Sequence, residues 1–368
     1  MSQPFRILEL TGSNRIGGVE TYLLRLGDFL QSRGHEVLWA TREGKALTRE
    51  LQARGHDVHP FYRASKWNPT TLFRLVQLLK SRRVDAIHTH IFAANSIGAR
   101  AARLAKIPSI ARVPAAENAA PYFGSTYVTA VSKNVARHIA AQGVASEKIR
   151  VFYNGVETAR FADLPEKEAM RARFGVPQNA FCAVCAASFT PRKGQKFLLE
   201  AAKNWPDLHV LLAGEGGEEA ALRAFCETHD LRNRVHFAGF LRDVREALAA
   251  GDAFVLPSSL EGLPNAVLEA QAAGMAVVAT DVAGTSEIVR DGQTGFLVPP
   301  RNSAALADAL GKLRAGDVRR ELGKNAQKMA RDEFESALCL EKFERFVGEV
   351  VTNWRNGRAL APADSSWQ

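Results

Sequence analysis

The sequence has few cysteines and no long apolar run. Four cysteines among 368 residues are too few for a secreted scaffold held together by disulfides. No stretch approaches the roughly 18 uninterrupted apolar residues that a membrane-spanning helix needs. The start, MSQPFRILEL, has no charged leader followed by a cleavable apolar block. We therefore expect a chain that stays in the cytoplasm.

Several chemical motifs are also missing. The chain has no GxGxxG, which is the fingerprint of nicotinamide dinucleotide binding, and no Asp-x-Asp at the end of an apolar run. Cys182 and Cys185 lie in the apolar stretch FCAVCAA, which predicts a buried strand. No second pair of cysteines or histidines completes a metal site with them. We expect no metal and no cofactor.

The positive charge is concentrated in the first half of the chain. The formal net charge is +9, yet residues 1–160 hold 23 Lys and Arg against 11 Asp and Glu, and the remaining residues hold 25 against 28. This asymmetry favours an anionic partner, either a membrane surface, a phosphorylated substrate or nucleic acid. A solvated basic face is the alternative. Nucleic acid fits the charge only, because no basic segment is interleaved with aromatic residues as in a stacking platform.

Two local clusters make an anionic membrane surface the expected partner. The first holds Arg63, Lys66 and Trp67, and the second lies on the helical pattern 71–83 with Arg74, Lys80, Arg82 and Arg83. The apolar residues of that pattern suit the core face of a helix, so we expect electrostatic attraction without insertion. They are Leu72, Phe73, Leu75, Val76, Leu78 and Leu79.

Short apolar runs alternate with helical patterns along the whole chain. FRILEL, EVLWAT, AIHTH, SIARV, YVTAV and IRVFYNG form a first series, and FCAVCAAS, LHVLLAG, VHFAGF, AFVLPS and MAVVAT form a second. This rhythm is typical of βαβ units and parallel sheets. We expect an α/β protein with two Rossmann-like domains that face one another across a cleft, lined by the loops at the carboxyl ends of the strands.

The polar segment 154–170, NGVETARFADLPEKEAM, separates the two series and predicts the crossing between domains. We expect an N-terminal acceptor-side domain over residues 1–159 and a C-terminal donor-binding domain over 160–334. A long helix over 335–355, which would pack back on the N-terminal domain, and a disordered tail over 356–368 follow.

Two loops combine glycine with a site for anions. Gly17 and Gly18 directly precede a predicted helix, where the backbone can approach a ligand closely and free amides face it. In the second series, Arg192 and Lys193 stand beside Gly194 before another helix, and two cations there suit a diphosphate. Each loop by itself is also compatible with a tight turn or with surface charge.

The segment LPSSLEGLPNAVLEAQAAG is the most informative part of the sequence. Glu261 follows the end of an apolar run, and Glu269 lies eight residues later on a helix that begins near Pro264 and Asn265. Amides at a helix start bind phosphate or sugar oxygens, and a carboxylate farther along accepts paired ribose hydroxyls. The position of both acids after a strand favours binding over solvated charge.

With these motifs the chain resembles the retaining GT-B glycosyltransferases, and in particular glycosyltransferase family 4. The similarity covers nearly the whole chain. It depends on GGVE, NGVETARF, RKG, the Gly239–Phe240 turn, EGLPNAVLEAQAAGMAVVAT, GTSEIV and DGQTGFLVPP.

The resemblance implies roles for individual residues. Glu261 would lie near the donor sugar, Glu269 would bind ribose, and Lys193 would contact the donor diphosphate. The family's arginine five residues before that lysine is Ser188 here, and Arg192 would supply the missing charge. The implied catalytic residues are Glu261, Lys193 and Arg192, and the implied donor-binding residues are Gly17, Gly18, Gly239, Phe240, Ser258, Asn265, Ala266, Val267 and Glu269.

Three residues of the N-terminal domain are candidates for lining the cleft. His88 and His90 end the predicted strand AIHTH, where the family commonly has a similar His-x-His, and a packed structural role is the alternative for His88. Glu117 lies in RVPAAENAA, where the family often has a histidine. Neither histidine has an acidic partner at a metal-ligand spacing in the sequence.

The resulting hypothesis is transfer of a sugar from a nucleotide diphosphate donor, with uridine the commoner base, to a hydroxyl of a glycan or glycolipid. Bacterial cell-surface polysaccharide or lipopolysaccharide assembly would use such a reaction. The sequence leaves two alternatives open: a nucleotide-sugar isomerase of the same fold, and a non-catalytic partner subunit.

Overall fold

The computed structural model describes residues 3–13, 17–61 and 69–360. The chain forms two compact units, one made of residues 1–154 with 337–368, and the other of residues 155–336. The first crossing comes five residues earlier than the sequence predicts, directly before Gly155. Arg63, Lys66 and Trp67 lie outside the described residues.

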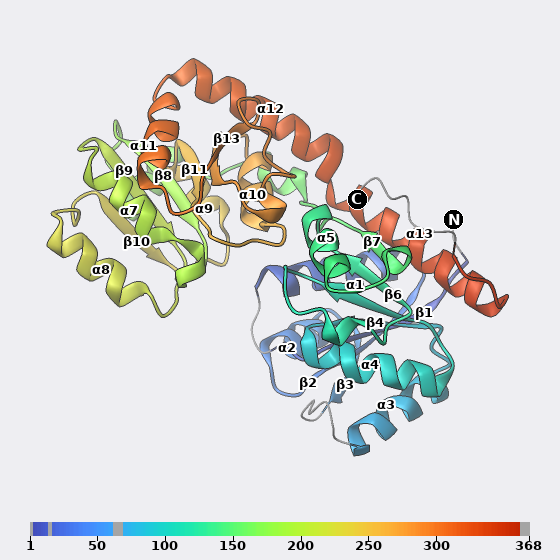
Figure 1. Cartoon of the computed structure of the whole chain (residues 1–368). Helices are drawn as coiled ribbons and strands as arrows, with labels where there is room; N and C mark the ends of the chain where they lie inside the picture. The colour runs from blue at the N-terminus through green and yellow to red at the C-terminus, as the bar shows by residue number, and fades with distance from the viewer. Residues whose placement is uncertain (1–2, 14–16, 62–68, 361–368) are drawn as a thin grey trace. The chain divides into compact units, whose positions relative to one another are not determined.

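Unit 1 contains a seven-stranded parallel sheet in the order β3-β2-β1-β4-β5-β6-β7, shown in blue to green in Figure 1. Its strands are β1 (Arg6–Thr11), β2 (Glu36–Arg42), β3 (Asp57–Phe61), β4 (Ala86–His90), β5 (Ser109–Val113), β6 (Tyr127–Ala130) and β7 (Ile149–Val151). Its helices are α1 (Gly18–Ser32), α2 (Ala46–Ala53), α3 (Pro69–Ser81), α4 (Phe92–Ala105), α5 (Lys133–Ala141) and α13 (Ser336–Arg355), whose first residue belongs to unit 2.

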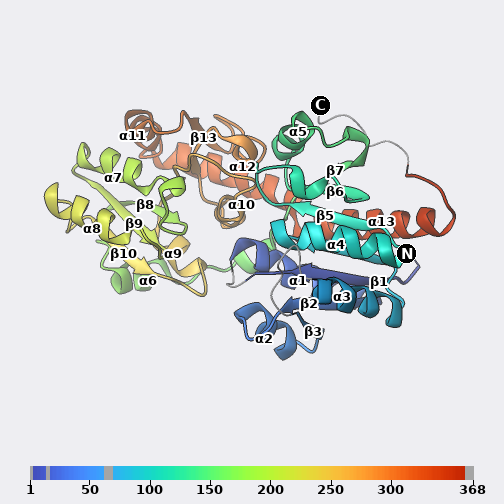
Figure 2. The ribbon, with the colours of Figure 1, turned by 60° about the horizontal axis from the view of Figure 1, so that its bottom comes forward.

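Alternate residues of these strands face two separate cores, as the period of two requires. Ile7 and Val37 pack with α1, α2 and α13 on one face of the sheet, whereas Leu8 and Leu38 pack with α3 and α4 on the other. Figure 2 shows the helices of unit 1 from a second direction. Glu9 and His88 are register partners and share the parity of Ile7, so polar groups interrupt the α1–α13 face.

Unit 2 contains a six-stranded parallel sheet in the order β10-β9-β8-β11-β12-β13. Its strands are β8 (Phe181–Ala186), β9 (Leu208–Ala213), β10 (Val235–Gly239), β11 (Ala253–Leu256), β12 (Val277–Thr280) and β13 (Gly295–Val298). Its helices are α6 (Lys167–Phe174), α7 (Gln195–Lys203), α8 (Glu219–Thr228), α9 (Arg245–Ala250), α10 (Asn265–Ala272), α11 (Ser303–Lys312) and α12 (Gly316–Phe334).

The two α/β units with parallel sheets confirm the predicted fold class, and the strands that the sequence pattern missed are edge strands. β3 and β13 each lie at the end of their sheet. Pro60 interrupts the apolar pattern of β3, and proline is tolerated at an edge because a missing amide there breaks no inner ladder. β13 has only four residues, too few for a clear alternation.

The last helix packs on the sheet of unit 1, against residues that are about 300 positions away in sequence. Leu340, Phe343 and Val347 of α13 are buried with Tyr22 and Trp39. Among the described residues, no helix combines the length and the apolar content that crossing a bilayer requires.

Candidate functional site

In unit 2, the loops after β8 and β11 are locked together by their backbones. The turn that holds Arg192 and Lys193 (Pro191–Lys193) ends at Gly194, whose φ is +69°. A Cβ at Gly194 would overlap the carbonyl group of Pro257. The amide of Ser259 donates to the carbonyl oxygen of Arg192 at 2.8 Å. Glycine is therefore required here because the two loops touch backbone to backbone.

This contact brings together three of the predicted side chains. Lys193 Nζ lies 2.5 Å from Glu261 Oε1, and Ser258 Oγ donates to the same oxygen at 2.6 Å. The side chain of Lys193 is 16% exposed and that of Glu261 6%. The ammonium group is thus held at the carboxyl edge of the sheet by a largely buried carboxylate, on a side chain that is still partly exposed.

The helix after this loop begins where the sequence predicts. α10 begins at Asn265, and Pro264 precedes it in an extended conformation without a side-chain cap of its own. Glu269 is half-buried one turn after Asn265, on the same side of the helix. The loop after β12 packs against this helix start, since a Cβ at Gly284 would overlap the carbonyl group of Gly262. Asn265 and Ala266 are partly exposed, whereas Val267 is buried.

A glycine-rich loop that was not among the predicted site segments lies beside this group. Gly214 and Gly216 follow β9 with φ of +148° and +158°, and a Cβ at either would overlap a carbonyl group of the loop after β8, at Ala187 or Phe189. The amide of Phe189 donates to Glu215 O at 2.9 Å. Three glycines in four residues directly after the apolar run LHVLLA were the available signal.

The Gly239–Phe240 turn adjoins this glycine-rich loop. The amide of Gly214 donates to the carbonyl oxygen of Gly239 at 2.8 Å, and the side chain of Phe240 is 62% exposed. Ser188 and Arg192 are exposed as well. All these loops come from the carboxyl ends of β8, β9, β10 and β11, where doubly wound sheets bind their ligands.

In unit 1, the predicted glycine loop is capped by the glutamate of its own motif. Glu20 Oε2 accepts a hydrogen bond from the amide of Gly17 at 2.9 Å, and the amide of Thr21 donates to Gly17 O at 2.9 Å. Gly17 and Gly18 are both exposed at the start of α1. The carboxylate near this helix start also complements the positive end of the helix dipole.

His88 and His90 are buried and share one carboxylate, that of Glu9. His90 Nε2 lies 2.6 Å from Glu9 Oε2, and His88 Nδ1 lies 3.1 Å from Glu9 Oε1. Both histidine side chains are at most 1% exposed. Glu9 has no short sequence spacing to either histidine, and it reaches both because β1 and β4 are adjacent in the sheet although they are far apart in sequence.

Burial controls the charge of this cluster. It raises the pKa of Glu9, and it lowers the pKa of His88 well below its usual value and that of His90 to about 3. Both histidines are therefore neutral, and each directs one ring nitrogen at the carboxyl group of Glu9. Arg112, also buried, further lowers the pKa of both histidines through its positive charge.

Glu9, His88 and His90 also offer three ligand atoms within 4.8 Å of one another, a group able to hold a metal ion. The positive charge of Arg112 in this low-dielectric surrounding opposes a divalent cation there. Phe343 of α13 packs on the ring of His88 at 4.8 Å. The cluster fits the structural alternative for His88 and extends it to His90.

Glu117 follows β5 and is half-buried. Its carboxylate accepts a hydrogen bond from the hydroxyl group of Tyr122. Burial and this carboxylate raise the pKa of Tyr122 above its usual range, so the phenol remains a donor. Glu117 is thus held in place at the carboxyl edge of the unit 1 sheet.

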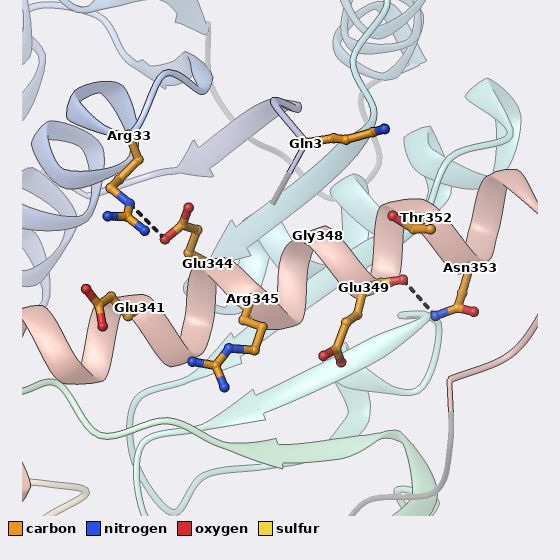
Figure 3. Close-up of a pocket in the computed structure, with 9 residues that line it drawn as sticks. All are labelled: Gln3, Arg33, Glu341, Glu344, Arg345, Gly348, Glu349, Thr352 and Asn353. Atoms are coloured by element: carbon orange, nitrogen blue, oxygen red, sulfur yellow. Dashed lines mark hydrogen bonds and ion pairs between the residues drawn. The ribbon is translucent and has the colours of Figure 1, made fainter. Parts of the chain in front are cut away.

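A hollow of about 520 Å³ lies beside α13 (Figure 3). Arg33 and Glu344 form an ion pair across it at 3.3 Å, and Glu344 also accepts from the buried His35 at 3.0 Å. Gln3, just before β1, lines the same hollow. The hollow therefore lies at the amino-terminal edge of the sheet, opposite the edge where such folds bind ligands.

Comparison with known proteins places both units in one group of enzymes. The model described as "Glycosyltransferase Family 4" matches residues 16–160, and the model "Glycosyl transferases group 1" matches residues 166–329. The chain belongs to glycosyltransferase family 4.

Named relatives of this family 4 enzyme align over most of its length. The UDP-Gal:alpha-D-GlcNAc-diphosphoundecaprenol alpha-1,3-galactosyltransferase of Escherichia coli is 27% identical over 77% of this chain and 80% of its own. The lipopolysaccharide core biosynthesis glycosyltransferase LpsE of Rhizobium meliloti is 28% identical over 81% and 86%. These relatives support the assignment over about four fifths of the chain.

Solved structures show the same fold. Anabaena Alr3699/HepE, crystallised with UDP and glucose, superimposes with a TM-score of 0.85 over 94% of this chain and 100% of its own, at 23% identity. The two parallel-sheet units of this family 4 chain thus form a GT-B fold. Unit 2, which holds Lys193, Glu261 and Glu269, is the part that matches the group 1 model.

Proposed function

We propose that this family 4 glycosyltransferase moves a sugar from a UDP-sugar to a hydroxyl group of a glycan or glycolipid, with retention at the anomeric carbon. The carrying observation is the pairing of Lys193 with Glu261 and Ser258 beside the start of α10. A cation and the positive end of a helix at one sheet edge suit a diphosphate, whose negative charge grows as the sugar leaves. The donor and acceptor classes are supported by the Escherichia coli relative, which takes UDP-Gal as donor and a diphosphoundecaprenol-linked sugar as acceptor.

In this proposal Lys193 neutralises the departing diphosphate and Glu269 accepts the ribose hydroxyls. Arg192, exposed on the same turn, supplies the second charge that Ser188 lacks. Glu261 orients the donor sugar and stabilises positive charge at its anomeric carbon. Because Glu261 Oε1 already accepts from Lys193 and Ser258, we assign it no nucleophilic role. Glu117 lines the acceptor side, and the enzyme works at the inner face of the cytoplasmic membrane.

The test is a thermal-shift screen of UDP, GDP, ADP and their sugars, followed by transfer assays with a panel of glycan and glycolipid acceptors. A nucleotide at a hundred times its dissociation constant adds about 2.7 kcal/mol to the free energy of unfolding. We expect UDP and a UDP-sugar to stabilise the protein, and label to pass to a hydroxyl acceptor. Interconversion of the donor without acceptor, or binding without turnover, would contradict the proposal.

Substitution of Glu269 and of Glu261 should distinguish binding of the nucleotide from binding of the donor sugar. Glu269→Gln should weaken binding of free UDP by one to two orders of magnitude, consistent with roughly 1.5–3 kcal/mol for hydrogen bonds to a charged group. Glu261→Gln should leave free UDP nearly unaffected and weaken the intact UDP-sugar. Calorimetric titration of both ligands measures this division, and equal losses for free UDP would show that it is wrong.

Transfer should continue in excess chelator. Lys193 and the amides of α10 lie where a divalent cation would otherwise offset the diphosphate charge. The measurement is the initial rate after dialysis against EDTA, compared with the rate after magnesium or manganese is added back. A rate abolished by EDTA and restored by either ion would refute metal independence.

A further inference from the structure

The entire net charge of the protein arises in one segment. Residues 58–116 contain ten Lys and Arg and a single acidic residue, Asp85. The rest of the chain is balanced, with 38 basic and 38 acidic residues. Asp85 is itself bound by Arg355 of α13 at 2.5 Å and by the amide of Arg6. The positive charge of this segment is therefore not offset from within it.

The structure places the two helices of this segment side by side. α3 and α4 pack on each other over the same face of the unit 1 sheet, and Figures 1 and 2 both draw them as neighbours. Their solvent side, with the residues that directly follow each helix, is what we call the α3–α4 face. Its exposed basic residues are Arg74, Lys80, Arg83, Arg100, Arg103 and Lys106.

Two basic residues of the segment are engaged elsewhere. Arg82 pairs with Asp57 and lies 3.7 Å from Glu36, and Arg112 is buried in the core. The cluster expected from the sequence is corrected accordingly. Arg82 does not belong to it, and Arg100, Arg103 and Lys106 on and just after α4 do.

Large apolar side chains stand among these charges. Phe73 is 68% exposed and Leu104 is 54% exposed, so one extends into solvent from each helix. The expectation that Phe73 belongs to the core face of its helix is wrong; Leu75 and Leu79 take that role. Exposed apolar residues rimmed by basic ones are typical of surfaces that meet a membrane.

We propose that the α3–α4 face docks this enzyme on an anionic membrane leaflet. Arg and Lys heads attract acidic lipid headgroups, and Phe73 and Leu104 enter the boundary between headgroups and acyl chains. A membrane fits better than nucleic acid because the apolar side chains protrude from helices, whereas stacking platforms present aromatic rings along a groove. The proposal extends the proposed function by naming where a lipid-linked acceptor is met.

The experiment is co-sedimentation of the full chain with phosphatidylcholine vesicles that contain or lack phosphatidylglycerol, at low and high salt. Each basic residue near an anionic leaflet strengthens binding about fivefold. The triple variant Arg74→Gln, Lys80→Gln, Arg103→Gln should therefore bind anionic vesicles at least about a hundredfold more weakly. Phe73→Ser should reduce the part of the binding that persists at high salt, where charges are screened.

The matched control removes the same charge from exposed positions in unit 2, as Lys203→Gln, Arg320→Gln, Lys324→Gln, and should bind like the unchanged protein. Equal loss in both triple variants, or equal binding to neutral vesicles, would overturn the proposal. So would binding to duplex DNA or RNA at concentrations that leave the vesicles unbound. UDP stabilisation of the α3–α4 variant, measured in parallel, separates failure of docking from failure of the donor site.

Discussion

Replacing Lys193 by alanine should lower turnover at least about a hundredfold while the protein stays folded. The ammonium group is held 2.5 Å from Glu261 Oε1 before any substrate binds. A charge fixed in advance stabilises the departing diphosphate without the cost of reorganisation, and loss of one such group commonly lowers kcat by this much. Steady-state kinetics with saturating UDP-sugar measures the effect.

Lys196 provides the matched control for this prediction. It lies three residues later on α7, its side chain is 65% exposed, and its contact with Glu200 is a long one of 3.9 Å. Lys196→Ala should leave turnover nearly unchanged. Arg192→Ala should lower turnover almost as much as Lys193→Ala if Arg192 replaces the charge absent at Ser188. Unchanged turnover in Lys193→Ala would show that Lys193 does not stabilise the departing diphosphate.

Replacing Arg112 by methionine should reduce the free energy of unfolding by about 3–5 kcal/mol. The Arg112 guanidinium lies 3.8 Å from the centre of the Tyr22 ring and donates to Asn154. Its charge also lowers the pKa of Glu9, against the larger effect of burial. Removing one member of such a group leaves an uncompensated buried charge, which is the costly outcome. Urea unfolding followed by circular dichroism measures the change.

The double variant Arg112→Met, Glu9→Gln tests whether the loss of stability comes from the charge of Glu9 left without its cation. It removes the stranded charge together with its partner, so it should be more stable than Arg112→Met alone, and the difference gives the coupling between the two sites. Arg103→Met, on the exposed side of α4, should change stability by no more than about 0.5 kcal/mol. A loss below about 1 kcal/mol in Arg112→Met would show that Glu9 does not depend on this cation.

The pattern of the sequence was sufficient for the inner strands and for the donor-side motifs. Apolar runs such as FCAVCA and AIHTH became β8 and β4 because a strand buried on both faces needs continuous apolar or hydrogen-bonded residues. The start of α10 followed from Pro264 and Asn265. The resemblance assigned Lys193 and Glu261 to one donor site, and the structure pairs them because the loops after the adjacent parallel strands β8 and β11 meet at one edge.

Other features depended on contacts between segments distant in sequence. The spacing of His88 and His90 says nothing of Glu9, which reaches them only because β1 lies beside β4. Likewise, the helical period of residues 71–83 does not predict that Asp57 and Glu36 pair with Arg82. It also does not predict that α4, which carries further basic residues, lies beside α3.

By itself, the sequence determined the two-unit α/β architecture and the residue types at the donor loops, because local periodicity and turn chemistry act over a few residues. The tertiary structure alone decided which charges are buried together and which remain in solvent. The Glu9–His88–His90 cluster with Arg112, the glycine-rich contacts at Gly214 and Gly216, and the α3–α4 face all depend on strand order and helix packing. Burial free energy and electrostatic pairing depend on distance in space, which no spacing along the chain specifies.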